Sequence, residues 1–286
     1  MSVTRTDIAF TSRGAQLRGW LYRPKSPLAA PGIVMAHGLT AVREMFLDRY
    51  AEAFAAAGFV TLVYDHFGFG ASDGEPRQSP TPSWQLEGYR DAINWLRRQA
   101  GVDADQIGIW GTSFSGGQVI MLASEHLPIR CAVAQVPALS GGPGQVPAAT
   151  VAAIGDALQN GRFDDVIPAV SQSADGLGLL YPDNSYGWFT RIHQERAPSW
   201  RNEIRVGALT EPFEPIDFLP KVRTPLRLVV APDDKLALPQ DGLKVASTNP
   251  IIDVVQIAGG HFDGYESGFT ESSGHAVDWF TQHLKT

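Results

Sequence analysis

Short apolar runs alternate with amphipathic segments along most of this chain. Runs rich in Val, Ile and Leu predict buried strands at residues 32–36, 59–64, 106–110, 129–136, 225–230 and 251–257. Segments with apolar residues near one face predict helices at residues 44–57, 84–100 and 268–284. Strands that are apolar throughout and alternate with helices are typical of a parallel sheet covered on both faces, so the pattern predicts an α/β fold.

The ends of several of these segments carry their own signals. Residues 7–23 alternate loosely around Arg13-Gly14, which predicts an antiparallel hairpin at a sheet edge. Ser83 is a good N-cap for the helix over 84–100, and Gly101 follows that helix as its stop signal. The chain is therefore expected to begin with a hairpin and to continue as strands alternating with helices.

Residues 137–221 break this alternation, because they contain no clear strand. The segment has a Gly-Gly-Pro-Gly stretch at 141–144, a helical pattern at 146–158 and recurring aromatic residues after it. An insertion of this length between two sheet strands is either disordered or a lid, and its aromatic content favours order. We expect a mostly helical cap at 137–221, inserted into a core made of residues 1–136 and 222–286.

Charge, hydropathy and cysteine content limit the partners and the location that this protein can be expected to have. With 23 basic and 30 acidic residues among 286, the net charge of −7 repels a phosphate backbone, so we expect no nucleic-acid partner. No apolar run approaches the roughly 20 residues that a membrane span needs, and the first ten residues lack an apolar signal core. Cys131 is the single cysteine, so no intrachain disulfide can form, which suits a cytoplasmic protein. The oligomeric state stays open, a homo-oligomer included.

The sequence also lacks the motifs that would bind a catalytic metal ion or a dinucleotide. There is no H-E-x-x-H sequence and no paired-cysteine motif, so we expect no catalytic metal. The glycine-rich stretch at 68–74 fails the G-x-G-x-x-G spacing, because Asp73 stands where the last glycine belongs. We therefore expect the protein to work without a cofactor.

The most informative motif lies at residues 107–117, where an apolar strand runs through Gly111 into Ser113 and a small-residue helix start follows. In a nucleophile elbow, a serine stands at a sharp strand-to-helix turn with its hydroxyl exposed above a sheet. Small residues are needed where the helix crosses back over the strand. Ser115 occupies the third small position, where the usual pattern has glycine, and serine is nearly as small. Ser113 is therefore the candidate nucleophile.

A serine nucleophile needs a general base within hydrogen-bond reach. His261 lies on a glycine-flanked loop directly after the strand expected at 251–257. That position places it over the sheet edge toward which the serine of an elbow points. His261 is therefore the candidate base.

The base in turn needs an acid that orients it. The loop after the strand at 225–230 holds two adjacent aspartates, Asp233 and Asp234. We favour Asp234, because the acid in such loops usually stands two residues before an apolar one, here Leu236, while Asp233 suits a turn. Asp263 is a third and less favoured candidate, because it is too close to His261 along the chain.

Two further groups of residues complete the expected site. The backbone N–H groups of Phe114, after the nucleophile, and Leu39, in the loop after the first parallel strand, are expected to bind the oxyanion. Pockets are lined mainly by apolar side chains, so the aromatic residues of the cap are the candidates for substrate contacts. These are Trp188, Phe189 and Trp200, and they suggest a small-molecule acyl substrate with an apolar or aromatic group.

Together these segments resemble the α/β-hydrolase superfamily over nearly the whole chain. The resemblance is carried by His37-Gly38, the loop at 64–72, the elbow, Asp234 and residues 260–263. Within the superfamily the chain is similar to the dienelactone-hydrolase-like and X-prolyl-peptidase-like branch. The resemblance implies a mostly parallel eight-stranded sheet with helices on both faces and an inserted cap. Phe67 stands where the family usually has arginine, a difference that concerns a local hydrogen-bond network.

The sequence therefore predicts a serine hydrolase that cleaves a carboxylic ester, thioester or lactone through an acyl-enzyme, with a Ser-His-Asp triad. An acyltransferase is the alternative, as in polyketide acyl transfer, because an alcohol or amine can replace water with the same triad. A non-catalytic binding protein would be marked by the loss of a triad member, and none is lost.

Overall fold

Eight strands form one sheet in the order β1-β2-β4-β3-β5-β6-β9-β10. The structure is a computed structural model that describes residues 3–25, 28–140, 146–181, 184–237 and 239–285. The strands are β1 Val3–Ser12, β2 Ala15–Pro24, β3 Ala30–Ala36, β4 Val60–Tyr64, β5 Val102–Thr112, β6 Cys131–Gln135, β9 Leu226–Val230 and β10 Ile252–Gln256. Only β1–β2 and β2–β4 pair antiparallel within this sheet. The predicted mostly parallel eight-stranded sheet is confirmed.

The edge of the sheet is the predicted hairpin. Its turn consists of Arg13 and Gly14, whose φ angles are 52° and 74°. Two successive residues with positive φ match the right-handed twist of the flanking strands, which is why such turns are preferred in tight hairpins.

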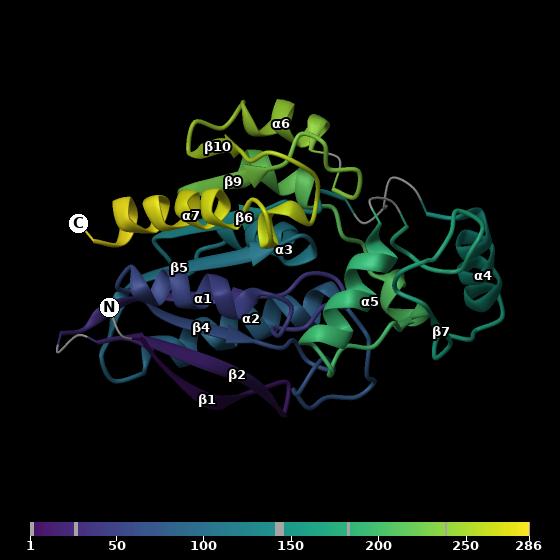
Figure 1. Cartoon of the computed structure of the whole chain (residues 1–286), viewed down its shortest axis with the longest axis horizontal. Coiled ribbons are helices and arrows are strands. Elements are labelled where there is room, and N and C mark those ends of the chain that lie inside the picture. The colour runs from purple at the N-terminus through teal and green to yellow at the C-terminus, as the bar shows by residue number, and fades with distance from the viewer. Residues whose placement is uncertain (1–2, 26–27, 141–145, 182–183, 238, 286) are drawn as a thin grey trace.

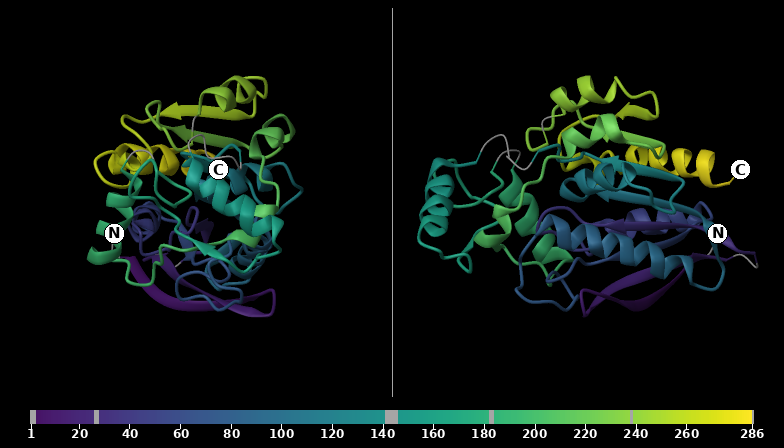
Figure 2. Two further views of the ribbon diagram at one scale, coloured as in Figure 1. Left: turned by 90° about the vertical axis from the view of Figure 1, so that its right-hand side faces the viewer. Right: turned by 180° about the vertical axis from the view of Figure 1, so that it is seen from behind.

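Helices cover both faces of the sheet (Figure 1). Helices α1 (Leu47–Ala56) and α7 (Phe269–Leu284) pack on one face, and α2 (Pro82–Arg97), α3 (Phe114–Ala123) and α6 (Gln240–Ala246) lie on the other (Figure 2, right). Successive side chains of a strand point to opposite faces, so Trp110 packs with α1 and α7 while its neighbour Ile109 packs with α2 and α3. No helix in the described ranges is long and apolar enough to cross a bilayer.

The start of α2 differs from the prediction. The helix begins at Pro82, with Thr81 rather than Ser83 at the N-cap position. Proline suits the first helical position, because its φ is already helical and it has no N–H to satisfy. The Ser83 N–H and hydroxyl instead donate to the Glu211 carboxylate at 2.6 Å and 2.8 Å. The Glu211 carboxylate, which lies between β6 and β9 in the sequence, therefore caps helix α2.

The segment between β6 and β9 lies at one end of the sheet (Figure 1). Its described elements are α4 (Ala148–Gln159), β7 (Val166–Ile167), α5 (Ser185–Glu195), β8 (Ile204–Arg205) and two 3-10 helices, Val206–Thr210 and Pro215–Lys221. The two short strands pair only with each other, in a separate small sheet. The Gly-Pro stretch at 141–144 lies outside the described residues.

Candidate active site

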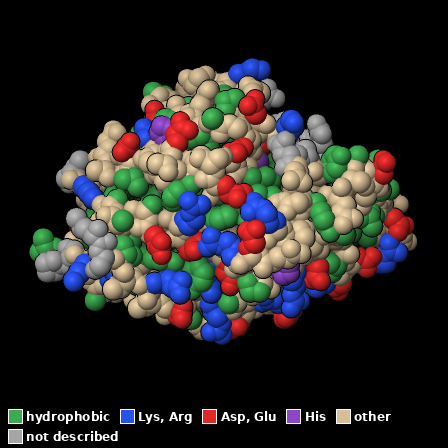
Figure 3. Space-filling view, viewed as in Figure 1, with side chains coloured by type: hydrophobic (Ala, Val, Ile, Leu, Met, Phe, Trp, Pro, Cys, Tyr) green, Lys and Arg blue, Asp and Glu red, His purple; other side chains and the backbone are tan. Residues whose placement is uncertain are grey.

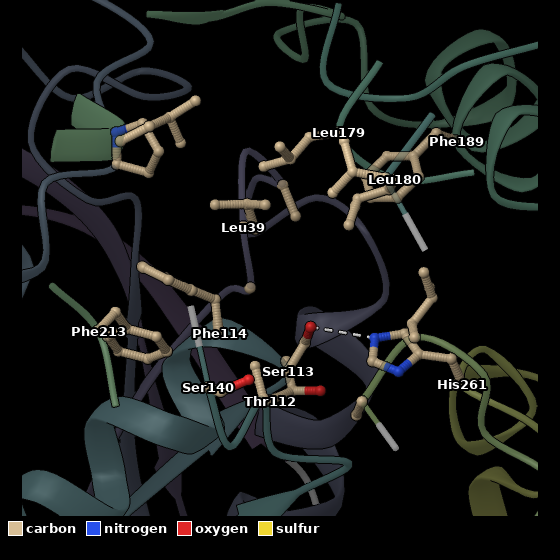
Figure 4. A pocket seen from close by; sticks show the side chains of 18 of the residues that line it. Leu39, Thr112, Ser113, Phe114, Ser140, Leu179, Leu180, Phe189, Phe213 and His261 are labelled. Atoms are coloured by element: carbon tan, nitrogen blue, oxygen red, sulfur yellow. Dashed lines mark hydrogen bonds between the residues drawn. The ribbon is translucent and has the colours of Figure 1, made fainter. Parts of the chain in front are cut away.

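Three polar side chains from distant parts of the chain meet at the carboxyl end of the sheet. Ser113 follows β5, Asp234 follows β9 and His261 follows β10. His261 Nε2 lies 3.0 Å from Ser113 Oγ (Figure 4). His261 Nδ1 lies 2.7 Å from Asp234 Oδ2. The structure thus brings together the three residues that the sequence singled out.

The backbone at Ser113 is strained in the way that an elbow requires. Its φ of 55° and ψ of −118° are unusual for a residue with a side chain. A Cβ at Gly111 would lie 2.3 Å from the backbone oxygen of Ser115, and one at Gly38 would lie 2.9 Å from Ser113 Cβ. Only glycine therefore fits at these two positions, and the tight packing holds the serine hydroxyl at the surface of the adjoining cavity.

The hydrogen-bond partners of Asp234 keep its side chain in the ionised form. Its Oδ1 accepts the backbone N–H groups of Leu236 at 2.8 Å and Ala237 at 2.9 Å, while Oδ2 faces His261. Burial by itself would raise the pKa of Asp234, but the imidazole and the two amides outweigh burial and hold that pKa below its usual value. The side chain is therefore ionised and fixed in place at neutral pH.

The two other candidate acids do not contact the imidazole. Asp233 is exposed to solvent. Asp263 accepts the N–H of Gly260 at 2.8 Å and the hydroxyl of Ser267 at 2.8 Å, so it braces the loop on which His261 stands. Of the three aspartates, Asp234 is the one that the fold places against His261.

The two amides expected to bind an oxyanion lie beside Ser113. Leu39 and Phe114 both line the cavity into which the serine opens. Phe114 is the first residue of α3, so its N–H has no carbonyl partner within its own helix and stands at the positive end of the helix dipole. Their role in binding an oxyanion stays a prediction.

Behind the elbow, the side chains of Ser115 and His66 and both the backbone and side chain of His37 form a buried polar network. The Ser115 hydroxyl donates to the carbonyl oxygen of His37 at 2.5 Å, and His66 Nε2 lies 2.9 Å from the same hydroxyl oxygen. The backbone N–H of His66 donates to His37 Nε2 at 3.1 Å, so His37 carries its proton on Nδ1, which faces the Gly38 carbonyl at 2.9 Å. This network ties the loops after β3 and β4 to the elbow, and Ser115, in place of the usual glycine, is a local signal of it.

This network predicts acid sensitivity of the fold. Burial lowers the pKa of His37 and lowers that of His66 well below the ordinary value. In the unfolded chain both would bind a proton near pH 6.5, so their contribution to stability is complete above that pH and is lost as the pH falls below it. Urea unfolding should therefore give a lower free energy at pH 5.5 than at pH 7.5, by about 1 kcal/mol or more.

His66→Gln tests the source of this effect, because glutamine does not titrate. The variant is expected to be less stable at pH 7.5 but to lose less further stability on acidification. An equal free energy of unfolding for the native chain at both pH values would contradict this account.

The loop around Phe67 differs from the family pattern and has its own packing. The Phe67 ring packs edge-on against Trp84, with their centroids 5.5 Å apart. Hydrogen bonding in the loop centres on Asp65, which accepts the Arg43 backbone N–H at 2.8 Å, the Arg43 guanidinium and the Ala71 N–H at 3.0 Å. The Asp65 carboxylate therefore has several hydrogen-bond donors without an arginine at position 67.

A cavity of about 320 Å³ opens above Ser113 and is mostly apolar. Its larger lining side chains are Leu39, Met45, Leu47, Phe114, Val151, Ile154, Leu179, Leu180, Trp188, Phe189, Leu209, Phe213 and Phe262. The inserted segment supplies many of them, so the cavity lies between that segment and the sheet (Figure 4).

Two of the three aromatic residues predicted to contact substrate reach this cavity. Trp188 and Phe189, both on α5, line it. Trp200 does not line it, because its ring stacks on Phe189 with centroids 5.3 Å apart and is 6% exposed. Phe189 stands between Trp200 and the cavity, so Trp200 supports the wall.

Known proteins are similar to this chain in sequence. A family model described as X-Pro dipeptidyl-peptidase (S15 family) matches residues 13–146. The quorum-quenching protein AidA of Acinetobacter baumannii (strain MDR-ZJ06) is 31% identical over 273 residues, which cover 91% of this chain and 88% of that protein. A thiohydrolase of Eupenicillium brefeldianum is 28% identical and covers 85% of this chain and 84% of its own.

Solved structures agree with the fold. The α/β hydrolase GrgF from Penicillium sp. sh18 superposes with a TM-score of 0.85 at 22% identity, over 99% of this chain and 100% of that one. The sheet, the elbow and a relative that matches nearly end to end point to the same family. The chain therefore belongs to the α/β-hydrolase superfamily, in its X-prolyl-peptidase-like branch.

Proposed function

We propose that this protein is a serine hydrolase that cleaves carboxylic esters, thioesters or lactones with Ser113, His261 and Asp234. One observation carries the proposal. A continuous hydrogen-bonded chain runs from Ser113 Oγ through His261 to Asp234, and it begins at an elbow that opens into a substrate-sized cavity.

In acylation, Ser113 Oγ attacks the carbonyl carbon and its proton passes to His261 Nε2. Asp234 keeps the other imidazole proton on Nδ1, so that Nε2 is free to accept, and it stabilises the imidazolium that forms. The N–H groups of Leu39 and Phe114 stabilise the oxyanion, a contribution of roughly 3 kcal/mol per donor in comparable sites. The carbon–oxygen or carbon–sulfur bond then breaks, and the leaving atom takes the proton from Nε2.

In deacylation, water attacks the acyl carbon and gives a proton to His261 Nε2. The bond between the acyl carbon and Ser113 Oγ breaks, Oγ takes back the proton, and the carboxylic acid is released. The cavity receives the acyl group in this scheme. Because its lining is mostly apolar, an apolar or aromatic acyl group fits, whereas burying an anionic acyl group there would cost free energy.

An acyl-enzyme trap tests the proposal. Acid quenching during turnover of p-nitrophenyl butyrate should give protein heavier by one butyryl group, and peptide mapping should place that group on Ser113. If p-nitrophenyl butyrate is hydrolysed but samples quenched during the fastest turnover carry no butyryl group on Ser113, the result would count against the proposal.

Acyl transfer to an alcohol or amine is the second candidate, because relatives include a polyketide transferase of Aspergillus fumigatus that is 35% identical over 136 residues. That relative matches only 47% of this chain. Adding increasing concentrations of a primary alcohol during turnover separates the two functions. Mainly carboxylic acid is expected from a hydrolase and mainly new ester from a transferase.

We assign the described part of residues 137–221 the role of a cap over this site. Its support is that Trp188, Phe189, Leu179 and Leu180 line the cavity.

A cytoplasmic location fits the single, buried cysteine. The face covered by α1 and α7 shows acidic and basic side chains interspersed (Figure 3), which together with the net charge of −7 disfavours a nucleic-acid partner.

A further inference from the structure

A second hollow, of about 1030 Å³, adjoins the apolar cavity and is lined by many more charged side chains. Trp188, His261 and Phe262 line both spaces, so the two meet at the imidazole. Ser113 lines only the apolar cavity, whereas charged and amide side chains from α5, the Asp234 loop and the His261 loop line the hollow. The candidate base thus stands between an apolar and a polar space.

Specific contacts fix the side chains that line both spaces. The ring of Trp188 stacks on Phe262 with centroids 4.5 Å apart and planes 20° apart. The Trp188 indole N–H donates to Glu266 Oε2 at 2.9 Å, and the Arg191 guanidinium donates to the same oxygen at 2.7 Å. These contacts join α5 to the segment after His261, so Trp188 and Phe262 are held in place where the two spaces adjoin.

Ester chemistry gives the two spaces different roles. The acyl carbon must lie at Ser113 Oγ, whereas the leaving oxygen must lie near His261 Nε2, because it takes the Nε2 proton as its bond to the acyl carbon breaks. We propose that the polar hollow binds the leaving group of the substrate, or an incoming acceptor, while the apolar cavity holds the acyl group. This inference rests on the proposed hydrolase function.

The charge of the hollow sets which leaving group it favours. Four carboxylates and two cations line it: Asp233, Asp234, Asp263 and Glu266 against Arg191 and Lys235. The excess of negative charge attracts a cationic leaving group. It repels a leaving group that has an anionic substituent near the scissile bond. The preferred substrate is therefore an ester of an apolar acid with a cationic or neutral polar alcohol.

Three esters that share one hexanoyl group test this preference. Choline supplies a cationic alcohol, 3,3-dimethylbutanol its neutral isostere and 2-sulfoethanol an anionic alcohol of similar size. We expect kcat/KM to be highest for the choline ester and lowest for the sulfoethyl ester, with about a tenfold spread that shrinks in 0.5 M KCl.

Two variants make the hollow one charge more positive at different places. Asp233→Asn removes an exposed carboxylate, and Gln240→Lys adds a cation at the exposed first residue of α6. Each is expected to lower the choline-to-sulfoethyl ratio of kcat/KM about twofold. Asp7→Asn makes the same charge change on β1, at the far edge of the sheet, and should leave the ratio unchanged.

Equal kcat/KM values for the choline and sulfoethyl esters, or a ratio that neither Asp233→Asn nor Gln240→Lys alters, would overturn the assignment of the hollow while leaving the hydrolase function intact. A different result, no cleavage of any ester and no acyl adduct on Ser113, would overturn the proposed function and with it this inference. The two failures are therefore distinguishable.

Discussion

Ser113→Ala is expected to lower kcat/KM for p-nitrophenyl butyrate by about 10⁴-fold or more, because the variant has no oxygen that can form the acyl-enzyme. Residual activity should come only from water attack assisted by the remaining groups. The variant keeps the Cβ that packs against Gly38, so the elbow should fold as before. Steady-state kinetics with active-site titration of the native protein would measure the effect.

Ser247→Ala is the matched control, because Ser247 is exposed at the end of α6 and its hydroxyl donates to the Lys244 carbonyl. It should keep the native rate. Thermal unfolding of both variants separates loss of chemistry from loss of fold. Equal turnover by Ser113→Ala and the native protein would show that the nucleophile is elsewhere.

Asp234→Asn is expected to lower kcat about 10⁴-fold with a much smaller change in KM. If the asparagine oxygen keeps the N–H groups of Leu236 and Ala237, its NH₂ faces His261 Nδ1. An NH₂ donor there selects the imidazole tautomer with its proton on Nε2, which cannot accept the Ser113 proton. The predicted defect is therefore one of proton placement, not of substrate binding.

Asp233→Asn is the informative comparison, because the two aspartates are adjacent and only Asp234 touches the imidazole. Toward a neutral ester, the Asp233 variant is expected to lose less than tenfold in kcat/KM, in keeping with a solvent-exposed carboxylate. A larger loss in the Asp233 variant than in the Asp234 variant would reverse the assignment of the acid.

Much of the sheet could be predicted because its signals are local. A buried parallel strand is apolar throughout, and an elbow needs glycine where backbones nearly touch, so both features leave their mark on consecutive residues. Helix α6 was missed because it spans only seven residues and contains Gly242, too short a segment for a helical period to be visible.

Long-range contacts explain the errors. Glu211, far along the chain, takes the Ser83 N–H and hydroxyl, so the local N-cap signal at Ser83 misplaced the start of α2. Trp188, Phe189 and Trp200 were equivalent in the sequence, and the packing of Trp200 behind Phe189 separates them.

The sequence alone determined the α/β fold, the elbow serine and the histidine loop, because each depends on neighbouring residues at a strand end. Tertiary structure decided that Asp234, not Asp233, meets the imidazole, and that Ser115 joins His37 and His66 in one buried network. It also set an apolar cavity and a polar hollow on either side of His261. The direction of a side chain and the partners of a buried polar group depend on segments that the chain brings together only when it folds.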